Sequence, residues 1–394
     1  MRRSYAVITL RYHNDKNISF YKLRHAGYKT NRGFERPEMY EDEAPLTLSE
    51  IYHQADSCRQ TTERAQDRTR LFEQFLALEK YSDIIITGCG SSHHLAICAS
   101  FAWSEMLARP VMAVASSELA HFAEHYLSSN SKPLVIAISR SGGTTEVKLA
   151  VEKLRREYGA RSLALTCDRG DVGDTCDAQI VFTECRERSV VMTQAFTCML
   201  TGLYLLADGA SGSSRAKEIS ALPMLIDGAI SQTESLRPLV EDNAIDRFFF
   251  LGSGAMKGLA DECALKMTEM ALETAFSHRT LEFRHGPKAT LNSTDQVVIF
   301  PAAAERQYLD TLLGEITATG AQVVVIDSQL CTYDDSLVTT LVIPQSTVLD
   351  SQFEVFRPAL YAHIGQLFAY WRAAIRDLNP DAPRHLARTV LLDV

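Results

Sequence analysis

The sequence predicts an α/β protein made of two similar halves, each a doubly wound parallel sheet flanked by helices. The first observation is an internal repeat, in which Gly88-Cys-Gly-Ser-Ser-His-His-Leu-Ala and Gly252-Ser-Gly-Ala-Met-Lys-Gly-Leu-Ala share both glycines and the Leu-Ala pair. The offset is 252 − 88 = 164 residues. The second observation is that short, continuous apolar segments alternate with helical segments, which is typical of parallel strands buried on both faces.

Ten apolar segments are predicted to be strands, five in each half. In the first half they are Ile84–Thr87, Val111–Ala115, Leu134–Ile138, Leu163–Thr166 and Ile180–Phe182. In the second half they are Phe248–Leu251, Thr274–Ser277, Val297–Phe300, Val323–Ile326 and Leu341–Ile343. Helices are expected to begin near Ser92, Ser117, Thr144 and Met192, and a long one is expected near Phe356–Leu378.

The segments outside the sheets give the rest of the layout. Residues 1–38 carry nine Lys or Arg against three acids, so we interpret them as a disordered basic extension or a mis-called start that folding does not need. A helix is expected over Thr47–Leu78, with Thr47 or Ser49 as its N-cap. Small polar residues at Gly209–Ser214 predict a flexible break. The predicted layout is an extension (1–38), a helical segment (39–78), a first domain (79–215), a helical connector (216–245), a second domain (246–378) and a tail (379–394).

Composition excludes several classes of partner. The net charge of −9 argues against nucleic acid and anionic membranes, and the sequence contains no run of eighteen apolar residues that could span a bilayer. Nine cysteines at scattered positions, with no Cys-x-x-Cys, favour reduced thiols and a cytoplasmic location. We therefore expect a cytoplasmic protein that binds a small molecule.

The first half carries a predicted phosphate-binding turn. Ser139-Arg-Ser-Gly-Gly-Thr-Thr145 follows a strand and opens a helix, so backbone N–H groups, hydroxyls and a guanidinium are available to an anion. An ordinary Ser- and Gly-rich helix cap is the alternative, but the turn at Gly88–Ser92 lies at the same edge of the sheet and favours phosphate. The second half has Pro301-Ala-Ala-Ala-Glu-Arg at the corresponding place, without hydroxyls. We therefore expect one phosphate site, in the first half.

Neither a nucleotide cofactor nor a metal is expected. The third glycine of a dinucleotide fingerprint is replaced by His93 in the first repeat and by Lys257 in the second, so NAD binding is improbable. His121-Phe-Ala-Glu-His125 matches a zinc pattern, but no third ligand is suggested, so a chance match is the better interpretation.

Candidate catalytic residues lie in the second half. Lys266 and Glu269 are three residues apart, on one face of the helix that follows the second glycine turn. This spacing is also that of an ordinary surface ion pair. His285 lies in the rigid loop Phe283-Arg-His-Gly-Pro-Lys288, where it is suited to move a proton near neutral pH. A carboxylate base and an imidazole are what an aldose–ketose isomerisation of a sugar phosphate needs.

Five motifs together resemble double SIS (sugar isomerase) domain proteins, in particular the isomerase half of glucosamine-6-phosphate synthase and the AgaS-type amino-sugar-phosphate isomerases and deaminases. They are Gly88–Ser92, Ser139–Thr145, Thr193–Thr197, Ala264–Glu269 and Glu282–Pro287. The resemblance covers about residues 45 to 394. It implies two tandem SIS domains, each with a five-stranded parallel sheet, and a homodimer that shares its active site.

The resemblance also implies roles for individual residues. Glu269 is expected to be the C1/C2 base with Lys266 beside it, and His285, from the partner subunit, is expected to open the sugar ring. The expected substrate-binding residues are Gly90, Ser91, Ser92, Ser139, Arg140, Ser141, Thr144 and Val190. Arg388 is a further catalytic candidate, because it lies where the synthase tail carries a lysine, although a guanidinium cannot form a Schiff base with a ketose.

These features predict an enzyme that isomerises or deaminates a hexosamine or ketohexose 6-phosphate by ring opening and C1/C2 proton transfer, without metal or cofactor. Glutamine-dependent amination is not expected, because neither Met1 nor Met39 is followed by a cysteine nucleophile and no glutaminase domain precedes the pair. Two alternatives stay open. One is a fructosamine-6-phosphate deglycase, and the other is a sugar-phosphate sensor without catalytic activity.

Overall fold

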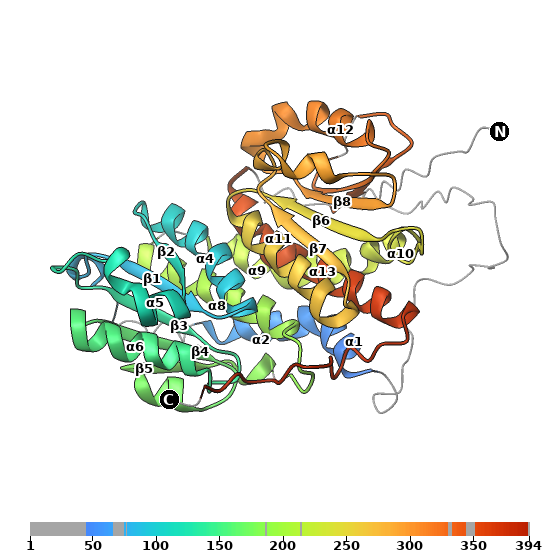
Figure 1. The fold of residues 1–394 in the computed structure, drawn as a ribbon. Helices are drawn as coiled ribbons and strands as arrows, with labels where there is room; N and C mark the ends of the chain where they lie inside the picture. The colour runs from blue at the N-terminus through green and yellow to red at the C-terminus, as the bar shows by residue number, and fades with distance from the viewer. Residues whose placement is uncertain are drawn as a thin grey trace, which may run out of the picture. The chain divides into compact units, whose positions relative to one another are not determined.

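The computed structural model describes residues 45–65, 75, 77–185, 187–212, 215–329, 333–343 and 351–392 (Figure 1). The predicted basic extension, residues 1–38, lies outside the described residues, as does part of the predicted helical segment 39–78. All the architecture below belongs to the compact unit that starts at Pro45.

Two five-stranded parallel sheets form the framework, as the sequence predicts. The first sheet has the order β2-β1-β3-β4-β5 and the second β10-β9-β8-β6-β7. Written in chain order within each half, the two orders are the same. The strands are β1 (Ile84–Gly88), β2 (Met112–Ala115), β3 (Leu134–Ile138), β4 (Arg161–Thr166), β5 (Ala178–Val181), β6 (Arg247–Gly252), β7 (Thr274–His278), β8 (Asp295–Phe300), β9 (Gln322–Asp327) and β10 (Val338–Val342).

Helices follow or separate these strands (Figure 1). The α-helices are α1 (Leu46–Tyr52), α2 (Gln54–Glu63), α4 (Ser91–Leu107), α5 (Ser116–Phe122), α6 (Thr145–Tyr158), α7 (Asp171–Thr175), α8 (Gln194–Ser211), α9 (Ala216–Thr233), α10 (Arg237–Val240), α11 (Ala255–Ala271), α12 (Leu309–Thr317) and α13 (Arg357–Ile375). The 3-10 turns are η2 (Leu78–Lys80), η3 (Ala123–His125), η4 (Thr183–Cys185), η5 (Glu234–Leu236), η6 (Glu282–Arg284), η7 (Pro287–Thr290), η8 (Ala303–Tyr308) and η9 (Ser351–Phe356). No helix in the described part of the chain is long and apolar enough to cross a membrane.

The internal repeat is visible in backbone conformation as well as in sequence. Gly90 and Gly254, which cap α4 and α11, have φ angles of 53° and 58°. The residues that end these two helices, Ala108 and Leu272, have φ angles of 49° and 56°, although neither is glycine. Both pairs are separated by 164 residues, because 254 − 90 and 272 − 108 give the same offset. The two strand-turn-helix units therefore share one local geometry.

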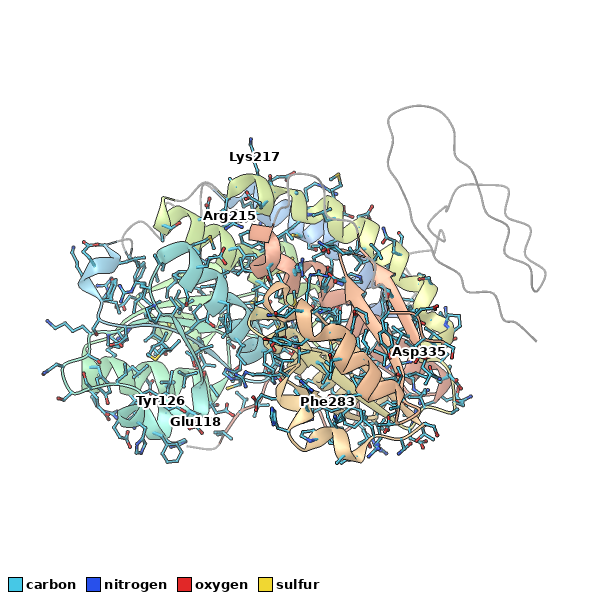
Figure 2. The ribbon with its side chains drawn as sticks, turned by 90° about the horizontal axis from the view of Figure 1, so that it is seen from above. Glu118, Tyr126, Arg215, Lys217, Phe283 and Asp335 are labelled. Carbon is cyan, nitrogen blue, oxygen red and sulfur yellow. The ribbon has the colours of Figure 1, made fainter. Side chains whose placement is uncertain are left out.

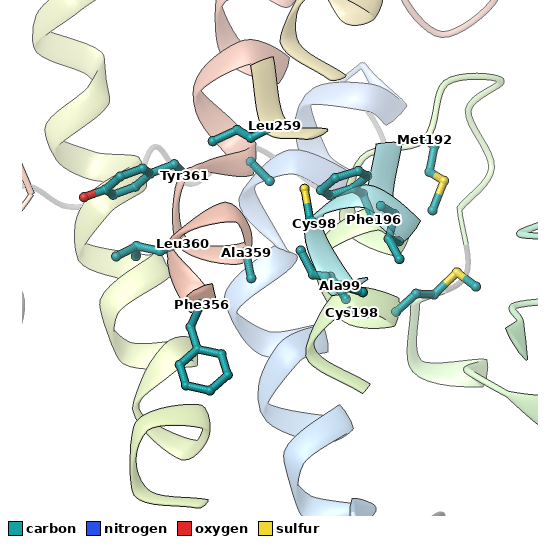
Figure 3. Close-up of a cluster of buried hydrophobic side chains, with 14 of the residues drawn as sticks. Cys98, Ala99, Met192, Phe196, Cys198, Leu259, Phe356, Ala359, Leu360 and Tyr361 are labelled. Atoms are coloured by element: carbon teal, nitrogen blue, oxygen red, sulfur yellow. The ribbon is translucent and has the colours of Figure 1, made fainter. Parts of the chain in front are cut away.

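Side chains from both sheets contribute to one continuous core. Alternate residues of β1 and β6, such as Ile84 and Phe248, point into this shared core, and their neighbours Ile85 and Phe249 point to the opposite faces. The opposite face of the first sheet is covered by α5 and α6, and that of the second by α12. Figure 3 shows the shared core where four helices meet, with Cys98 and Ala99 on α4, Phe196 and Cys198 on α8, Leu259 on α11, and Ala359, Leu360 and Tyr361 on α13.

The prediction of one helix over Thr47–Leu78 is wrong in two respects. In the described part of this range the chain forms the helices α1 and α2, which are separated at His53, and Leu78 belongs to a 3-10 turn. The N-cap residue is Pro45, whose side chain cannot cap a helix. The carboxylate of Asp381, from the tail, accepts the backbone N–H groups of Leu46 at 2.9 Å and of Thr47 at 2.7 Å instead. A cap supplied from 334 residues away leaves no local sequence signal.

The predicted break at Gly209–Ser214 begins later than expected. Helix α8 continues through Gly209 to Ser211 and ends at Gly212, whose φ of 65° is the left-handed conformation that terminates helices. Residues 213 and 214 lie outside the described residues. The apolar face of α8 packs in the shared core, and this packing outweighs the low helix propensity of Gly209.

Candidate functional site

The two predicted turns of the first half lie side by side at one edge of the sheet. Strands β1 and β3 are paired neighbours with Thr87 opposite Ala137, so the turns that follow them emerge together. The turn after β1 is tight, because a Cβ atom on Gly88 would lie 2.7 Å from that of Ser92. It leads directly into α4, so Ser91 and Ser92 lie at the positive end of that helix.

The turn after β3 has the features of an anion cradle. The hydroxyls of Ser139 and Thr144 are 2.8 Å apart, and α6 begins at Thr145. Gly142 has a φ of 72°, and a Cβ atom there would lie 2.7 Å from the carbonyl oxygen of Asp168. The turn therefore requires glycine at this position. The first turn of a helix leaves backbone N–H groups without helical partners, so the cradle can offer both N–H and O–H donors.

Arg140 has different partners from those the sequence predicted. Its guanidinium donates to the carboxylate of Glu187 at 3.0 Å, to the carbonyl of Val190 at 2.7 Å and to the carbonyl of Arg388 at 3.3 Å. Glu187 is buried and also accepts the backbone N–H of Thr193 at 2.7 Å, close to the start of α8. Arg140 thus ties the phosphate turn to a loop and to the tail. Its predicted contact with phosphate stays a prediction.

Val190 and Arg388 both lie beside Arg140. The N–H of Val190 donates to the carbonyl of Asp381 at 3.2 Å, so its backbone is already occupied on both sides. The guanidinium of Arg388 donates to Asp168 at 2.9 Å, at the carboxyl edge of the first sheet. The predicted catalytic role of Arg388 therefore stays a prediction without a structural contact behind it.

In the second half a carboxylate occupies the turn that corresponds to the phosphate cradle. The backbone N–H of Ala303, which begins the 3-10 turn after β8, donates to Glu354 at 2.8 Å. An internal anion thus already binds where the first half would accept an external one. This arrangement favours a single phosphate site, in the first half.

Helices α4 and α11 bring the two halves together at a close crossing. A Cβ atom on Gly258 of α11 would lie 2.5 Å from the carbonyl oxygen of His94 and 2.7 Å from Sγ of Cys98, both on α4. Only glycine permits this approach. As a result, Lys266 of α11 reaches Ser91 at the start of α4, and its Nζ donates to the Ser91 hydroxyl at 3.0 Å.

Lys266 is the centre of a buried charge cluster. Its side chain is fully buried and forms ion pairs with Glu262, at 3.0 Å, and with Glu269. Burial on its own lowers the pKa of Lys266, but Glu262 and Glu269 outweigh that effect and raise it. Lys266 is therefore a permanent cation that contacts both Ser91 of the first half and the predicted base of the second half. It cannot act as a neutral nucleophile at physiological pH.

Glu262 and His94 belong to this cluster, although the sequence analysis did not assign them to the site. Glu262 is 1% exposed, and its second carboxylate oxygen lies 3.1 Å from Nδ1 of His94. Burial on its own raises the pKa of Glu262, but Lys266 and then His94 more than compensate, so its pKa is lowered. The spacing of Glu262 four residues before Lys266 on one helix face was a usable signal. The contact with His94 left none.

Glu269 differs from its counterpart in the repeat. The Glu269 side chain is 16% exposed and pairs with Lys266. Glu105, at the corresponding position (269 − 164 = 105), is 47% exposed and pairs with Arg215 at 3.1 Å. Arg215, labelled in Figure 2, lies at the start of the connector, where it is the N-cap residue of α9. Of the two equivalent carboxylates, Glu269 thus shares Lys266 with Ser91, whereas Glu105 pairs with Arg215 instead.

His285 lies in a firmly anchored loop but is itself exposed. Phe283, labelled in Figure 2, is fully buried in the second domain. Arg284 and Lys288 both donate to Glu315, at 2.6 and 2.7 Å, and this lowers the pKa of Glu315 to about 2. Among the described residues no hydrogen bond or ion pair joins the side chain of His285 to Glu269. Within one protomer the two predicted catalytic groups are therefore not joined by a direct polar contact.

Comparisons with known proteins agree with this architecture. Glutamine–fructose-6-phosphate aminotransferase (isomerizing) of Idiomarina loihiensis is 28% identical over 372 residues, which are 88% of this chain and 58% of that protein. The chain thus spans little more than half the length of this relative. The structure of glucosamine-6-phosphate deaminase from Thermotoga maritima has a TM-score of 0.66 at 29% identity and covers 88% of this chain and 100% of that one. Tagatose-6-phosphate ketose/aldose isomerase from Escherichia coli shares the fold, with a TM-score of 0.77 at 23% identity over 90% of this chain and 97% of that one.

A family model for the SIS domain matches the chain twice, over residues 77–208 and 243–375. These two matches together cover more than half of the 394 residues. Each match contains all five strands of one sheet. The repeated glycine turns and the shared strand order have the same two-fold division. The chain therefore belongs to the SIS domain family and contains one SIS domain in each half.

Proposed function

We propose that this protein is a phosphosugar isomerase or deaminase. It acts on a hexosamine or ketohexose 6-phosphate, opens the sugar ring and transfers a proton between C1 and C2. The proposal is supported by the relatives, which carry isomerase and deaminase names, and by the chemistry of the cluster around Lys266. A sensor without catalysis would have no need of a buried ammonium that fixes a carboxylate beside the phosphate turn.

The contact of Lys266 with both Ser91 and Glu269 is the observation that carries the proposal. Ser91 opens the helix that follows one of the two anion-binding turns, and Glu269 is a carboxylate on the other domain. A phosphate held by Ser139, Ser141 and Thr144 would anchor the far end of the sugar. The carbon chain of a hexose 6-phosphate would then extend toward Lys266 and Glu269.

In the proposed reaction Glu269 accepts a proton from one of the two carbons and returns it to the other, through an enediol or enolamine. Lys266 pairs with Glu269 and holds its carboxylate in place beside Ser91. In an amino sugar the same proton transfer gives an imine, and hydrolysis of the imine releases ammonia. No residue of the cluster has to form a covalent bond with the sugar.

The exposure of His285 favours a dimer in which this residue serves the partner's site. A ring-opening imidazole has to come within hydrogen-bond distance of the ring oxygen or the anomeric hydroxyl. Among the described residues of one protomer, His285 forms no hydrogen bond or ion pair with Glu269, whereas its loop is rigidly held by Phe283 and Glu315. We therefore propose a homodimer with a shared site. Mixing inactive Glu269→Gln and His285→Ala protomers should restore part of the activity if this is correct.

A panel of 6-phosphates tests the proposed reaction. The protein is incubated with glucosamine, galactosamine, fructose, tagatose and fructosamine 6-phosphates in heavy water. Ammonia release and exchange of the C1 or C2 proton are followed by NMR, with and without added ammonia or glutamine. Turnover of fructosamine 6-phosphate alone would instead indicate a deglycase. Tight binding of a sugar phosphate without any exchange would indicate a sensor, and the proposed activity would then be wrong.

Glu269 and Glu105 provide a matched pair of variants for the base. Glu269→Gln should still bind the sugar phosphate but lose proton exchange by roughly 10²–10⁴-fold, which is the usual effect of removing one acid–base group. Glu105→Gln should leave exchange close to that of the unaltered protein, because Glu105 pairs with Arg215 and not with Lys266. Equal rates for the two variants would contradict the assignment of the base.

A further inference from the structure

The crossing of α4 and α11 is nearly symmetric in backbone but not in chemistry. His94 and Gly258 occupy equivalent positions of the repeat, because 94 + 164 = 258. The first half therefore carries an imidazole where the second half carries no side chain. Gly258 lets the helices approach, and His94 uses that approach to reach Glu262 on the opposite helix. The contact links the two domains directly beside Lys266.

The direction of the His94 hydrogen bond follows from the charges. An ionised carboxylate can only accept, so Nδ1 of His94 carries the hydrogen that is donated to Glu262 at 3.1 Å. Glu262 is ionised, since its pKa is lowered despite its burial. Its two oxygens thus have separate partners, with Lys266 at 3.0 Å on one and His94 on the other. Each partner comes from a different helix.

Loss of the imidazole would change how Lys266 is held. Glu262 would keep one oxygen on Lys266 but would have no described donor for the other in a site with 1% exposure. A buried carboxylate in that state either takes up a proton or turns toward the nearest cation. Both responses alter the contacts that the ammonium of Lys266 makes with Glu269 and Ser91. The effect would therefore reach the base without any contact between His94 and substrate.

We propose that His94 is a positioning residue for this reaction. Through Glu262 and Lys266 it fixes the carboxylate of Glu269 relative to the phosphate-binding half. The inference rests on the proposed function, in which Glu269 transfers the proton. It assigns a catalytic consequence to a residue of the first domain that lies outside the phosphate turns.

Two substitutions separate positioning from a merely structural role. His94→Leu removes the donor at similar volume, whereas His94→Asn retains an N–H donor near the position of Nδ1. We expect His94→Leu to lower kcat about tenfold to a hundredfold, as a misplaced catalytic group does. KM for the sugar phosphate should change little, because the phosphate turns are untouched. His94→Asn should recover most of the lost kcat, and His121→Leu, on the exposed surface of α5, should behave like the unaltered protein.

A double-substitution cycle with Glu262→Gln tests the route. If His94 acts through Glu262, adding His94→Leu to Glu262→Gln should lower kcat by much less than it does alone. A double variant that instead lowered kcat by the product of the two separate factors would overturn the proposal. So would an unchanged kcat in His94→Leu, a loss of kcat that His94→Asn fails to restore in a folded protein, or a loss confined to KM.

The contact can also be measured without turnover. Histidine-selective ¹⁵N labelling should show a protonated Nδ1 for His94, with a chemical shift that changes in Glu262→Gln. This measurement separates the two possible failures. An unaltered protein that exchanges no proton in any 6-phosphate would refute the proposed function, and an unprotonated Nδ1 would refute the positioning role even in an active enzyme.

Discussion

Replacing Gly258 with alanine should weaken both the fold and the activity. Gly258 lies where α11 crosses α4, and the added Cβ atom would be 2.5 Å from the carbonyl oxygen of His94 and 2.9 Å from the backbone nitrogen of Cys98. Ordinary contacts of a Cβ atom begin at 3.4 Å, so the helices must separate by up to about 0.9 Å (3.4 − 2.5). These two atoms belong to the backbone, so no side-chain rotation can relieve their overlap with the added Cβ atom.

The size of the effect follows from two opposing terms. Overpacking of a well-packed core costs about 1–3 kcal/mol. Alanine has the higher helix propensity and returns about 1 kcal/mol. We therefore expect the free energy of unfolding to fall by up to about 2 kcal/mol. Because the contacts of Lys266 with Ser91 and of His94 with Glu262 span this crossing, a shift of about 1 Å should also lower kcat by up to about a hundredfold.

Gly228 provides the matched control. It lies on the exposed side of α9, and a Cβ atom there would meet nothing within 4 Å. Gly228→Ala should therefore stabilise the protein by about 1 kcal/mol and leave kcat unchanged. Urea unfolding and proton-exchange rates of both variants test the argument. If Gly258→Ala were as stable and as active as Gly228→Ala, the crossing would not be close-packed and the reasoning would be refuted.

Two further substitutions test the phosphate-binding half. Ser141→Ala should weaken binding of inorganic phosphate or a sugar 6-phosphate by about 1–3 kcal/mol, the effect of losing one hydrogen bond to a charged group, and unchanged affinity by calorimetry would contradict the predicted site. Glu187→Gln should lower the free energy of unfolding by about 3 kcal/mol, because it leaves the guanidinium of Arg140 buried without a counter-charge. Asp171→Asn, at an ion pair whose carboxylate is 72% exposed, should change that free energy by less than about 0.5 kcal/mol, and equal effects in urea unfolding would show that the Arg140 pair is not structural.

The sheets could be predicted from sequence because their signals are local. All ten predicted strands are present, and their bounds agree to within a few residues. Continuous apolar segments and glycine turns act within a few residues of themselves, so the alternation of strand and helix is readable without tertiary contacts. The duplication strengthened the prediction, since each half supplied the same pattern. The helix expected over Thr47–Leu78 failed for the opposite reason, because its start depends on Asp381 in the tail.

The site was only partly predictable. Motifs placed Ser91, Lys266 and Glu269 among the site residues, and the structure brings these three into one cluster. Motifs also suggested Arg140 for the phosphate, but they did not indicate that its guanidinium binds Glu187. A motif fixes where a residue lies in an element but not which way a long side chain turns. That choice depends on the partners that other elements offer.

The sequence by itself determined the repeat, the parallel sheets, the glycine turns and the helix face that carries Lys266 and Glu269. Tertiary structure alone decided that α4 and α11 cross at Gly258 and that His94 meets Glu262 across 168 residues of sequence. The physical reason is one of range. Hydrophobic periodicity and backbone conformation are set by neighbours in the chain, whereas the partner of a buried charge is set by which helices pack together and how closely.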